Sequence, residues 1–193
     1  MVYKKLSLFF ILVFISLISC DVFANDSDKK VKGIKKKKEI ADFILNNIIK
    51  LYDVPQHGLL SETYPVNPNH KVDYLAEGST QKQNQEVAFL WPYSGTLSGT
   101  IALYTVTKEE KYLDLLEKRL LPGLEKYFDE SRLPVGYQSY PIFAGYSDRF
   151  YDDNVWLALD FCALYASTKN HKYLDKALEI YEFIYSGWDE NLD

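Results

Sequence analysis

The chain has 193 residues, of which 47% are hydrophobic and 16% aromatic, and its formal net charge is only −5. This length suits one domain or part of a larger one, and the small charge gives no electrostatic argument for nucleic-acid binding. Two cysteines exclude a disulfide framework, and the spacing of the three histidines resembles no metal site. A globular protein with a packed core is expected.

The first 24 residues are typical of an export signal. Two lysines precede an apolar run over residues 6–18, which is too short to span a bilayer but suits a secretory signal core. Residues 17–20 (Leu-Ile-Ser-Cys) match the pattern cleaved by the bacterial lipoprotein signal peptidase, so we expect Cys20 to be lipidated. The alternative is ordinary cleavage after Ala24. Both predict an exported protein of the bacterial cell envelope, either lipid-anchored or periplasmic to extracellular.

A lysine-rich segment follows over residues 25–36, and seven lysines lie between Lys29 and Lys38. We expect a solvated tether, with binding to acidic lipid or glycan as the alternative. A helix is predicted over about residues 37–51. Between Asp53 and about Gln85, several residues argue against regular structure: Pro55, Gly58, Pro65, Pro68 and Gly78.

An internal repeat organises the rest of the chain. Residues 102–114 (Ala-Leu-Tyr-Thr-Val-Thr-Lys-Glu-Glu-Lys-Tyr-Leu-Asp) recur as residues 163–175, with nine of 13 positions identical at an offset of 61 residues. Such periodicity usually indicates stacked copies of one helical unit. Each copy is predicted as a helix ending near Thr-Lys, a short polar turn, and a second helix starting near Lys-Tyr-Leu-Asp.

The two helices of the second copy differ in character. Residues 155–166 are apolar on nearly every side, which predicts a helix buried all round, with Cys162 as a small core residue. The next helix is amphipathic and should pack outside the first; its expected packing face comprises Leu174, Leu178, Tyr181 and Tyr185. Repeated inner and outer helices predict an all-α fold, an (α/α)6 toroid. A solenoid is the alternative, although its repeats are usually about 34 to 47 residues long.

The period also bears on how much of the toroid this chain holds. Six pairs of 61 residues would need about 360 residues. Only two complete inner–outer pairs and one earlier helix are visible in the sequence. We therefore expect residues 37–193 to form the N-terminal part of a toroidal catalytic domain, about half of the ring.

The repeat register predicts which segments share a rim. The shift of 61 residues aligns residues 91–93 (Trp-Pro-Tyr) with residues 152–154 (Asp-Asp-Asn), so both segments should precede an inner helix on one rim. The loop over residues 133–151 should lie there as well. Glu62 is a further candidate for this rim, although a lone carboxylate is more often plain surface.

Aromatic residues are abundant in these rim segments. Aromatic faces can stack on sugar rings while hydroxyl groups bond sugar oxygens. The rim residues expected to bind substrate are Trp91, Tyr93, Tyr137, Tyr140, Tyr146, Arg149 and Tyr151. Core packing is the alternative, and it is the one we prefer for Trp156. Among neighbouring glycine and serine residues, exposure is expected for Tyr137, Tyr140 and Tyr146.

Two adjacent carboxylates, Asp152 and Asp153, start the second inner helix. Acidic residues often cap a helix N-terminus and complement its dipole, so capping is the alternative to catalysis. Arg149 and the helix N-terminus can hold one carboxylate ionised, while its neighbour is pushed towards the protonated form. One ionised and one protonated acid are what glycosidases use to cleave a sugar–sugar bond. The spacing leaves retaining and inverting mechanisms open.

Four segments then carry a family resemblance: residues 90–95 (Leu-Trp-Pro-Tyr-Ser-Gly), 136–140 (Gly-Tyr-Gln-Ser-Tyr), 147–156 (Ser-Asp-Arg-Phe-Tyr-Asp-Asp-Asn-Val-Trp) and 186–189 (Ser-Gly-Trp-Asp). From about residue 40 to its end, the chain resembles glycoside hydrolase family 76. The resemblance implies an (α/α)6 toroid that cleaves internal α-1,6-mannosidic bonds with retention. It implies Asp152 as the nucleophile and Asp153 as the acid/base, with no metal or organic cofactor.

The sequence thus predicts an exported, monomeric glycosidase of the endo-α-1,6-mannanase type. Its expected partners are an α-mannan polysaccharide and, through a lipid anchor, a membrane, but no nucleic acid. Two alternatives stay open. One is a transglycosylase on the same scaffold, and the other is a non-catalytic glycan-binding lipoprotein.

Overall fold

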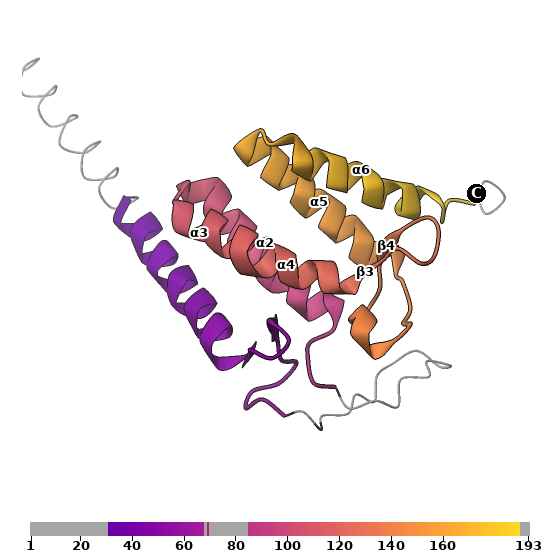
Figure 1. Ribbon diagram of the computed structural model, residues 1–193. Helices are drawn as coiled ribbons and strands as arrows, with labels where there is room; N and C mark the ends of the chain where they lie inside the picture. The colour runs from indigo at the N-terminus through magenta and orange to yellow at the C-terminus, as the bar shows by residue number, and fades with distance from the viewer. Residues whose placement is uncertain (1–30, 68, 70–84, 190–193) are drawn as a thin grey trace, which may run out of the picture. The chain divides into compact units, whose positions relative to one another are not determined.

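The computed structural model describes residues 31–67, 69 and 85–189 (Figure 1). The predicted export signal, Cys20 and residues 25–30 lie outside the described residues. The chain divides into two compact units, residues 1–43 and 44–193. Residues 31–43 of the first unit and residues 44–51 of the second are helical. Residues 31–36, expected to belong to a solvated tether, are therefore helical.

Within the described ranges, no helix combines the length and the apolar character that crossing a membrane requires.

Two helical pairs form the main regular structure of the second unit. In the first pair, α2 (Leu90–Thr107) is followed by one long helical stretch, which comprises α3 (Glu110–Leu115), the π-helical η1 (Leu116–Leu120), α4 (Leu121–Leu124) and the 3-10 turn η2 (Glu125–Tyr127). In the second pair, α5 (Tyr151–Thr168) is followed by α6 (His171–Tyr185). Figure 1 shows α5 and α6 running beside each other, and likewise α2 beside the α3–α4 stretch. The predicted inner–outer pairs are confirmed.

Short strand pairs interrupt the segments that were expected to be irregular. β1 (Asp53–Val54) pairs antiparallel with β2 (Leu59–Leu60) around a turn that ends at Gly58, whose φ of 59° lies in the left-handed region. β3 (Phe128–Asp129) pairs antiparallel with β4 (Gly136–Tyr137), and a 3-10 turn, η3 (Ile142–Ala144), follows. The second strand pair directs the rim loop back towards the start of α5.

The repeated sequence builds the same helix ending twice. Lys108 and Lys169 both adopt the left-handed conformation, with φ of 56° and 62°, and each backbone N–H donates to the carbonyl of the tyrosine four residues earlier. The threonine before each lysine donates its hydroxyl to the carbonyl four residues back, at 2.7 Å. The same hydroxyl accepts the backbone N–H two residues ahead, at 3.2 Å. The repeat therefore encodes one local structure used in both pairs.

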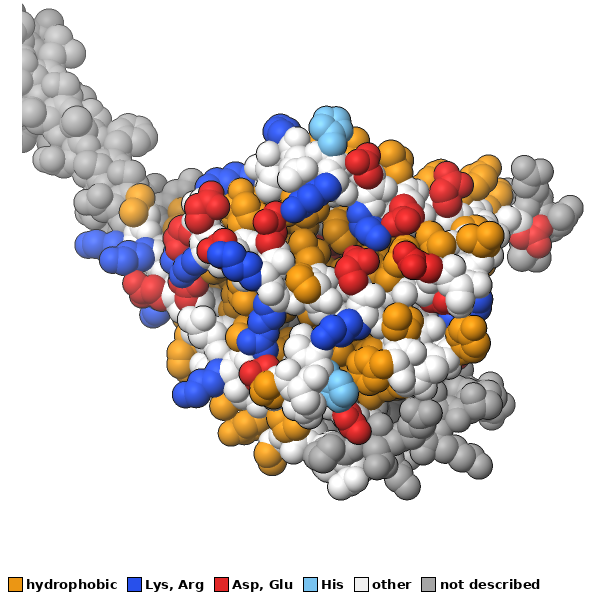
Figure 2. All heavy atoms as spheres, in the orientation of Figure 1, with side chains coloured by type: hydrophobic (Ala, Val, Ile, Leu, Met, Phe, Trp, Pro, Cys, Tyr) orange, Lys and Arg blue, Asp and Glu red, His pale blue; other side chains and the backbone are white. Residues whose placement is uncertain are grey.

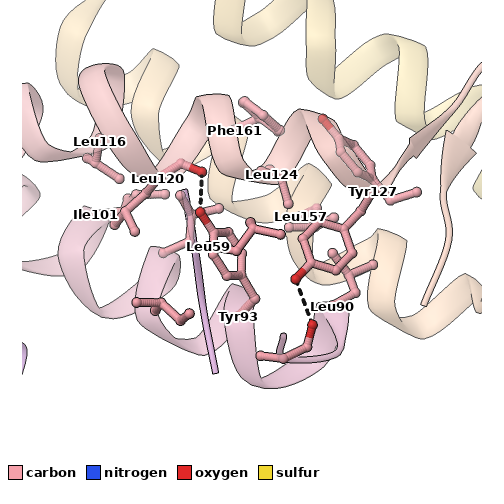
Figure 3. Close-up of a cluster of buried hydrophobic side chains, with 14 of the residues drawn as sticks. Leu59, Leu90, Tyr93, Ile101, Leu116, Leu120, Leu124, Tyr127, Leu157 and Phe161 are labelled. Carbon is pink, nitrogen blue, oxygen red and sulfur yellow. Dashed lines mark hydrogen bonds between the residues drawn. The ribbon is translucent and has the colours of Figure 1, made fainter. Parts of the chain in front are cut away.

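The first outer stretch differs from the second because of a proline. Pro122 has no backbone N–H and crowds the carbonyl four residues earlier, so a regular α-helix cannot continue through it. The π-helical turn η1 absorbs this irregularity just before Pro122. The Tyr93 hydroxyl donates to the Leu120 carbonyl at 2.9 Å, as the dashed line in Figure 3 shows. Gly123 is needed beside it, since a Cβ there would lie 2.0 Å from the Tyr93 hydroxyl oxygen.

Polar contacts fix the inner helices α2 and α5 side by side in parallel. The Ser98 hydroxyl donates to the Asp160 carboxylate at 2.6 Å, and Thr105 and Ser167 share a hydrogen bond of 2.9 Å two turns further along. Both pairs are 62 residues apart in sequence, close to the repeat offset. The equivalent starts of the two inner helices therefore lie on one side of the molecule, as the repeat register predicts.

The outer helices are joined across their surface by charged groups. Glu117 accepts hydrogen bonds from the Lys172 ammonium at 2.8 Å and from the Tyr173 hydroxyl at 2.6 Å. Lys176 lies 3.5 Å from a Glu125 oxygen and 3.9 Å from the centre of the Phe128 ring. On the face shown in Figure 2, acidic and basic side chains are interspersed with apolar ones.

The core fills the space between the paired helices. Leu90, Tyr93, Leu120, Leu124 and Leu157 meet there in Figure 3. Tyr127 contributes its ring and donates its hydroxyl to the Ala88 carbonyl at 2.7 Å. Large aromatic rings therefore supply much of the buried apolar area, and the hydroxyl groups of Tyr93 and Tyr127 are satisfied by backbone carbonyls.

Two expectations about helix faces are wrong. Helix α5 is not buried all round: Val155, Leu159 and Cys162 are exposed along one face. In α6 the packing face comprises Tyr173, Ala177, Ile180 and Phe183, whereas Leu178, Tyr181 and Tyr185 are exposed. The helix carries two apolar stripes one position apart, and the stripe ending in Phe183 packs because Gly136 leaves room for that ring.

Candidate active site

The two aspartates start α5 and have different surroundings. Asp152 is exposed and Asp153 is partly buried. The Asp152 carboxylate accepts the backbone N–H of Asp153 at 3.0 Å. Burial, together with the smaller effect of the nearby Asp152 charge, raises the pKa of Asp153 to about 6. The site therefore holds one solvated carboxyl group and one that keeps its proton to higher pH.

Asn154 anchors this turn. It is fully buried, and its side-chain amide donates to the carbonyls of Tyr137 and Phe150 at 2.9 and 2.8 Å. Its carbonyl oxygen accepts the Tyr137 backbone N–H at 2.9 Å. The amide thus binds β4 to the first turn of α5 and fixes where the preceding aspartates lie. Its place in the Asp-Asp-Asn triplet was visible in the sequence, but its role was missed.

The Tyr151 ring packs against Phe183 of α6 and against Gly187 of the C-terminal Ser-Gly-Trp-Asp segment. Its ring stacks on Phe183, with centroids 4.9 Å apart and planes at 21°. On the C-terminal side, a Cβ on Gly187 would lie 2.5 Å from a Tyr151 ring carbon. The glycine of the Ser-Gly-Trp-Asp segment is therefore required for close approach to the rim. Tyr151 stays partly exposed at 46%, so it remains a candidate for substrate contact.

Arg149 does not hold either aspartate, which corrects the prediction. Its guanidinium donates to the carbonyls of Arg132 and Pro134 at 2.9 and 2.7 Å and lies 3.9 Å from Asp129. It also lies over the Phe183 ring, 4.7 Å from the centroid. Arg149 is engaged with the rim loop because buried carbonyls and Asp129 offer it closer partners than the exposed start of α5. Its role is to shape the loop.

A buried glutamine completes the loop. The Gln138 amide donates to the carbonyls of Tyr140 and Gly145 at 2.7 and 2.9 Å and accepts from Arg132 at 3.0 Å. These hydrogen bonds hold residues 138–147 in a closed loop that leads to Phe150. Gln138 is a second positioning residue that the sequence interpretation missed.

Three of the tyrosines expected to bind substrate are buried. Tyr93 is committed to the Leu120 carbonyl, and the Tyr137 hydroxyl donates to Glu125 at 2.7 Å. The Tyr140 hydroxyl accepts the Val87 N–H at 3.4 Å. The β3–β4 pairing and the Gln138 bonds turn these rings inward, so the expected exposure of Tyr137 and Tyr140 is wrong. These rings form core beneath the rim.

Other aromatic side chains of the predicted rim segments do reach the surface. Tyr146 is 73% exposed, with the Arg132 guanidinium 5.3 Å from its ring centre. Trp91 and Trp156 are exposed at 54% and 52%, and their ring centroids are 6.3 Å apart. The preference for core packing of Trp156 is therefore wrong. Trp91 and Trp156 are the rings that the two inner helices bring together.

Glu62, the further rim candidate, contacts the start of α2. Its carboxylate accepts the backbone N–H of Phe89 at 3.0 Å, which satisfies a free amide at the helix N-terminus. Among the residues that the structure describes, no group of three or more His, Cys, Asp or Glu side chains could hold a metal ion.

Comparisons with known proteins bear on the family and the fold. The chain resembles a family 76 mannosidase from Bacteroides thetaiotaomicron VPI-5482, at 25% identity and a TM-score of 0.64. It also resembles a family 76 glycoside hydrolase from a bovine Bacteroides thetaiotaomicron strain, at 28% identity and a TM-score of 0.61. Each match covers 79% of this chain but only 38% and 30% of those chains, respectively. No curated protein matches the sequence.

The match to a family model decides the classification. The model for glycosyl hydrolase family 76 matches residues 37–192, which includes both inner–outer pairs and all four sequence motifs. The expected α/α-toroid fold is confirmed with it, since the matching enzymes have that fold. The chain belongs to glycoside hydrolase family 76.

Proposed function

We propose that this chain carries the catalytic carboxylates of an enzyme that cleaves internal α-1,6-mannosidic bonds with retention. The observation that carries the proposal is the difference between the two adjacent acids. Asp152 is exposed, whereas burial raises the pKa of Asp153 to about 6. A retaining glycosidase needs this division between an ionised nucleophile and a protonated acid.

In the first step, the Asp153 carboxyl group donates its proton to the glycosidic oxygen as the bond between that oxygen and C1 breaks. An Asp152 oxygen bonds to C1, forming a mannosyl ester. In the second step, the Asp153 carboxylate takes a proton from water, whose oxygen attacks C1 and releases Asp152. Two inversions at C1 leave the configuration retained.

The surroundings support these roles. The Asp152 carboxylate accepts the Asp153 backbone N–H at 3.0 Å, in the first turn of α5, and its side chain is exposed on the rim. The buried Asn154 side chain hydrogen-bonds to the Tyr137 backbone and fixes the first turn of α5. The two carboxyl groups therefore project from an anchored turn. We further propose export to the bacterial cell envelope, with lipidation of Cys20, on the basis of the N-terminal sequence.

Replacement of each aspartate tests the proposal. Asp152→Ala and Asp153→Ala are expected to abolish the release of reducing ends from α-1,6-mannan. Asp175→Ala, an exposed aspartate on α6, is the matched control and should cleave at the rate of the original chain. Cleavage that survives both rim substitutions would sink the assignment.

Product analysis separates the two related activities. Released mannosides should carry the α configuration at early times in the NMR spectrum, as retention requires. Hydrolysis should persist when a sugar acceptor is added. A shift of most product to longer oligosaccharides would identify a transglycosylase, and mannan binding without any product would identify a glycan-binding protein.

A further inference from the structure

Two tryptophans at the starts of the inner helices are half exposed and touch each other. Trp91 belongs to the first turn of α2, and Trp156 lies early in α5. Their ring centroids are 6.3 Å apart and their planes meet at 66°, an edge-to-face arrangement. Large apolar rings that stay exposed together mark an interaction site more often than a packing defect.

Helix geometry places Trp156 against the aspartates. It follows Asp153 by three residues and Asp152 by four, and side chains at these spacings are neighbours on a helix surface. Helical side chains lean towards the N-terminus, so the Trp156 indole covers the turn that carries both carboxyl groups. The ring therefore borders the place where the reacting sugar would lie.

Trp91 reaches the same place from the other helix. The Ser98–Asp160 hydrogen bond of 2.6 Å fixes the lateral position of α2 and α5, and Trp91 lies two turns before Ser98. The two rings thus come from separate helices whose register is set by polar contacts. In this structure the planes of the two rings meet at 66°, an arrangement that can discriminate between ligand shapes.

Resting on the proposed function, we propose that Trp91 and Trp156 form an aromatic corner that selects bent α-1,6-linked mannan over a flat β-1,4-linked chain. The apolar face of a sugar ring stacks on an aromatic face. In a 1,6 linkage, the extra methylene lets successive rings turn relative to each other, so neighbouring sugars can each contact one indole. The near-coplanar rings of a β-1,4 ribbon cannot contact two planes that meet at 66°.

Intrinsic fluorescence gives a direct readout, because the chain has only three tryptophans. Trp91→Leu and Trp156→Leu are compared with Trp188→Phe, which removes the third, exposed tryptophan. All are made with Asp152→Asn to stop turnover, and circular dichroism checks that each variant folds. The probes are α-1,6-mannotetraose and β-1,4-mannotetraose.

The α-1,6 oligosaccharide is expected to change the fluorescence and to bind about tenfold more weakly to each leucine variant, about the loss of one aromatic stacking contact. Trp188→Phe should keep its affinity. The β-1,4 oligosaccharide should bind the unsubstituted corner at least tenfold more weakly than the α-1,6 one, a difference that the leucine variants should lose.

Two results overturn the corner. Leucine variants that bind α-1,6-mannotetraose as tightly as the Asp152→Asn parent, or a parent that binds both linkages equally, refute it. They leave the proposed function standing if the chain with Asp152 intact cleaves α-1,6-mannan. Refutation of the proposed function as well requires that the Asp152→Asn parent fails to bind α-1,6-mannan and that the chain with Asp152 intact fails to cleave it.

Discussion

The two inner helices start from equivalent positions and put different chemistry on the same frame. At an offset of 61 residues, Tyr93 in α2 corresponds to Asn154 in α5, and both are buried anchors that donate to backbone carbonyls. The positions before them face outward: Trp91 is exposed in one helix and Asp152 in the other. In both segments, residues 91–93 and 152–154, the third residue thus fixes the start of the helix. The first two residues are then free for function.

The largest expected effect is a difference in mannan cleavage between substitutions of Asp153 and Pro92, the second residues of segments 152–154 and 91–93. Asp153→Asn should lower mannan cleavage by about 10² to 10⁴-fold, because general acid catalysis is lost. Pro92→Ala, at the equivalent place in α2, should change it by less than about tenfold. Cleavage by the parent should decline as pH rises through about 6, where the Asp153 carboxyl loses its proton. Initial rates from pH 4 to 8 check both, and a decline that persists in Asp153→Asn would assign it to another group.

The next largest difference is expected between the buried anchors Asn154 and Tyr93, in the free energy of unfolding. Asn154→Ala leaves the Tyr137 N–H and carbonyl without their partner, so the free energy of unfolding should fall by about 2–4 kcal/mol. Tyr93→Phe removes only the donor to the Leu120 carbonyl and should cost about 1–2 kcal/mol. Urea denaturation of the two variants measures the difference. Equal losses would mean that the two anchors do not differ in the way their hydrogen bonds indicate.

Glycines offer a smaller contrast between a crowded and an open position. Gly187→Ala should destabilise the chain and displace Tyr151, since the new Cβ would lie 2.5 Å from its ring. Gly99→Ala in α2 has nothing within 4 Å and should stabilise the helix by up to about 1 kcal/mol. Thermal unfolding compares them, and a neutral Gly187→Ala would show that the Tyr151 ring can move at no cost.

The smallest effect concerns Asp160, which stands where α2 has Gly99. Burial raises the pKa of Asp160 to about 6, although the Ser98 hydroxyl bond lowers it in part. The folded chain therefore holds a proton that the unfolded chain releases near pH 4. This stabilisation is full below pH about 4 and is lost as pH rises to about 6.

The melting temperature of Asp160→Asn should consequently fall less between pH 4 and 6 than that of the parent. At pH 7.5 the melting temperature of the variant should be a few degrees higher than that of the parent. Asp175→Asn on α6 is the control. Parallel curves for Asp160→Asn and the parent would show that Asp160 keeps its ordinary pKa in the folded chain.

The sequence predicted the architecture well because the repeat is local. The nine identical positions of the 13-residue repeat include the Tyr, Thr and Lys residues that build both helix endings. The helix pairs and the rim register therefore followed from spacing alone. The start of α5 at the aspartate pair was predicted from the same register, whereas the catalytic role of the pair stays a prediction. Local patterns that repeat can be read without knowledge of long-range contacts.

Side-chain orientation was predicted less well because it depends on partners distant in sequence. Tyr137 turns inward through its bond to Glu125 and the Asn154 amide, and Arg149 prefers loop carbonyls to the neighbouring aspartates. In α6 two apolar stripes compete, and only the contact of Phe183 with Gly136 decides between them. Neither hydrophobic periodicity nor residue type contains this information.

The most direct test of the proposed dyad is to trap its covalent intermediate. A 2-fluoro α-1,6-mannobiosyl fluoride slows both steps but keeps a good leaving group, so the ester should accumulate on the chain. Intact mass spectrometry should show one added 2-deoxy-2-fluoro-mannobiosyl unit on the parent, peptide mapping should locate it on Asp152, and Asp152→Ala should carry no adduct. No adduct in the parent, or an adduct on any residue other than Asp152, would contradict the account.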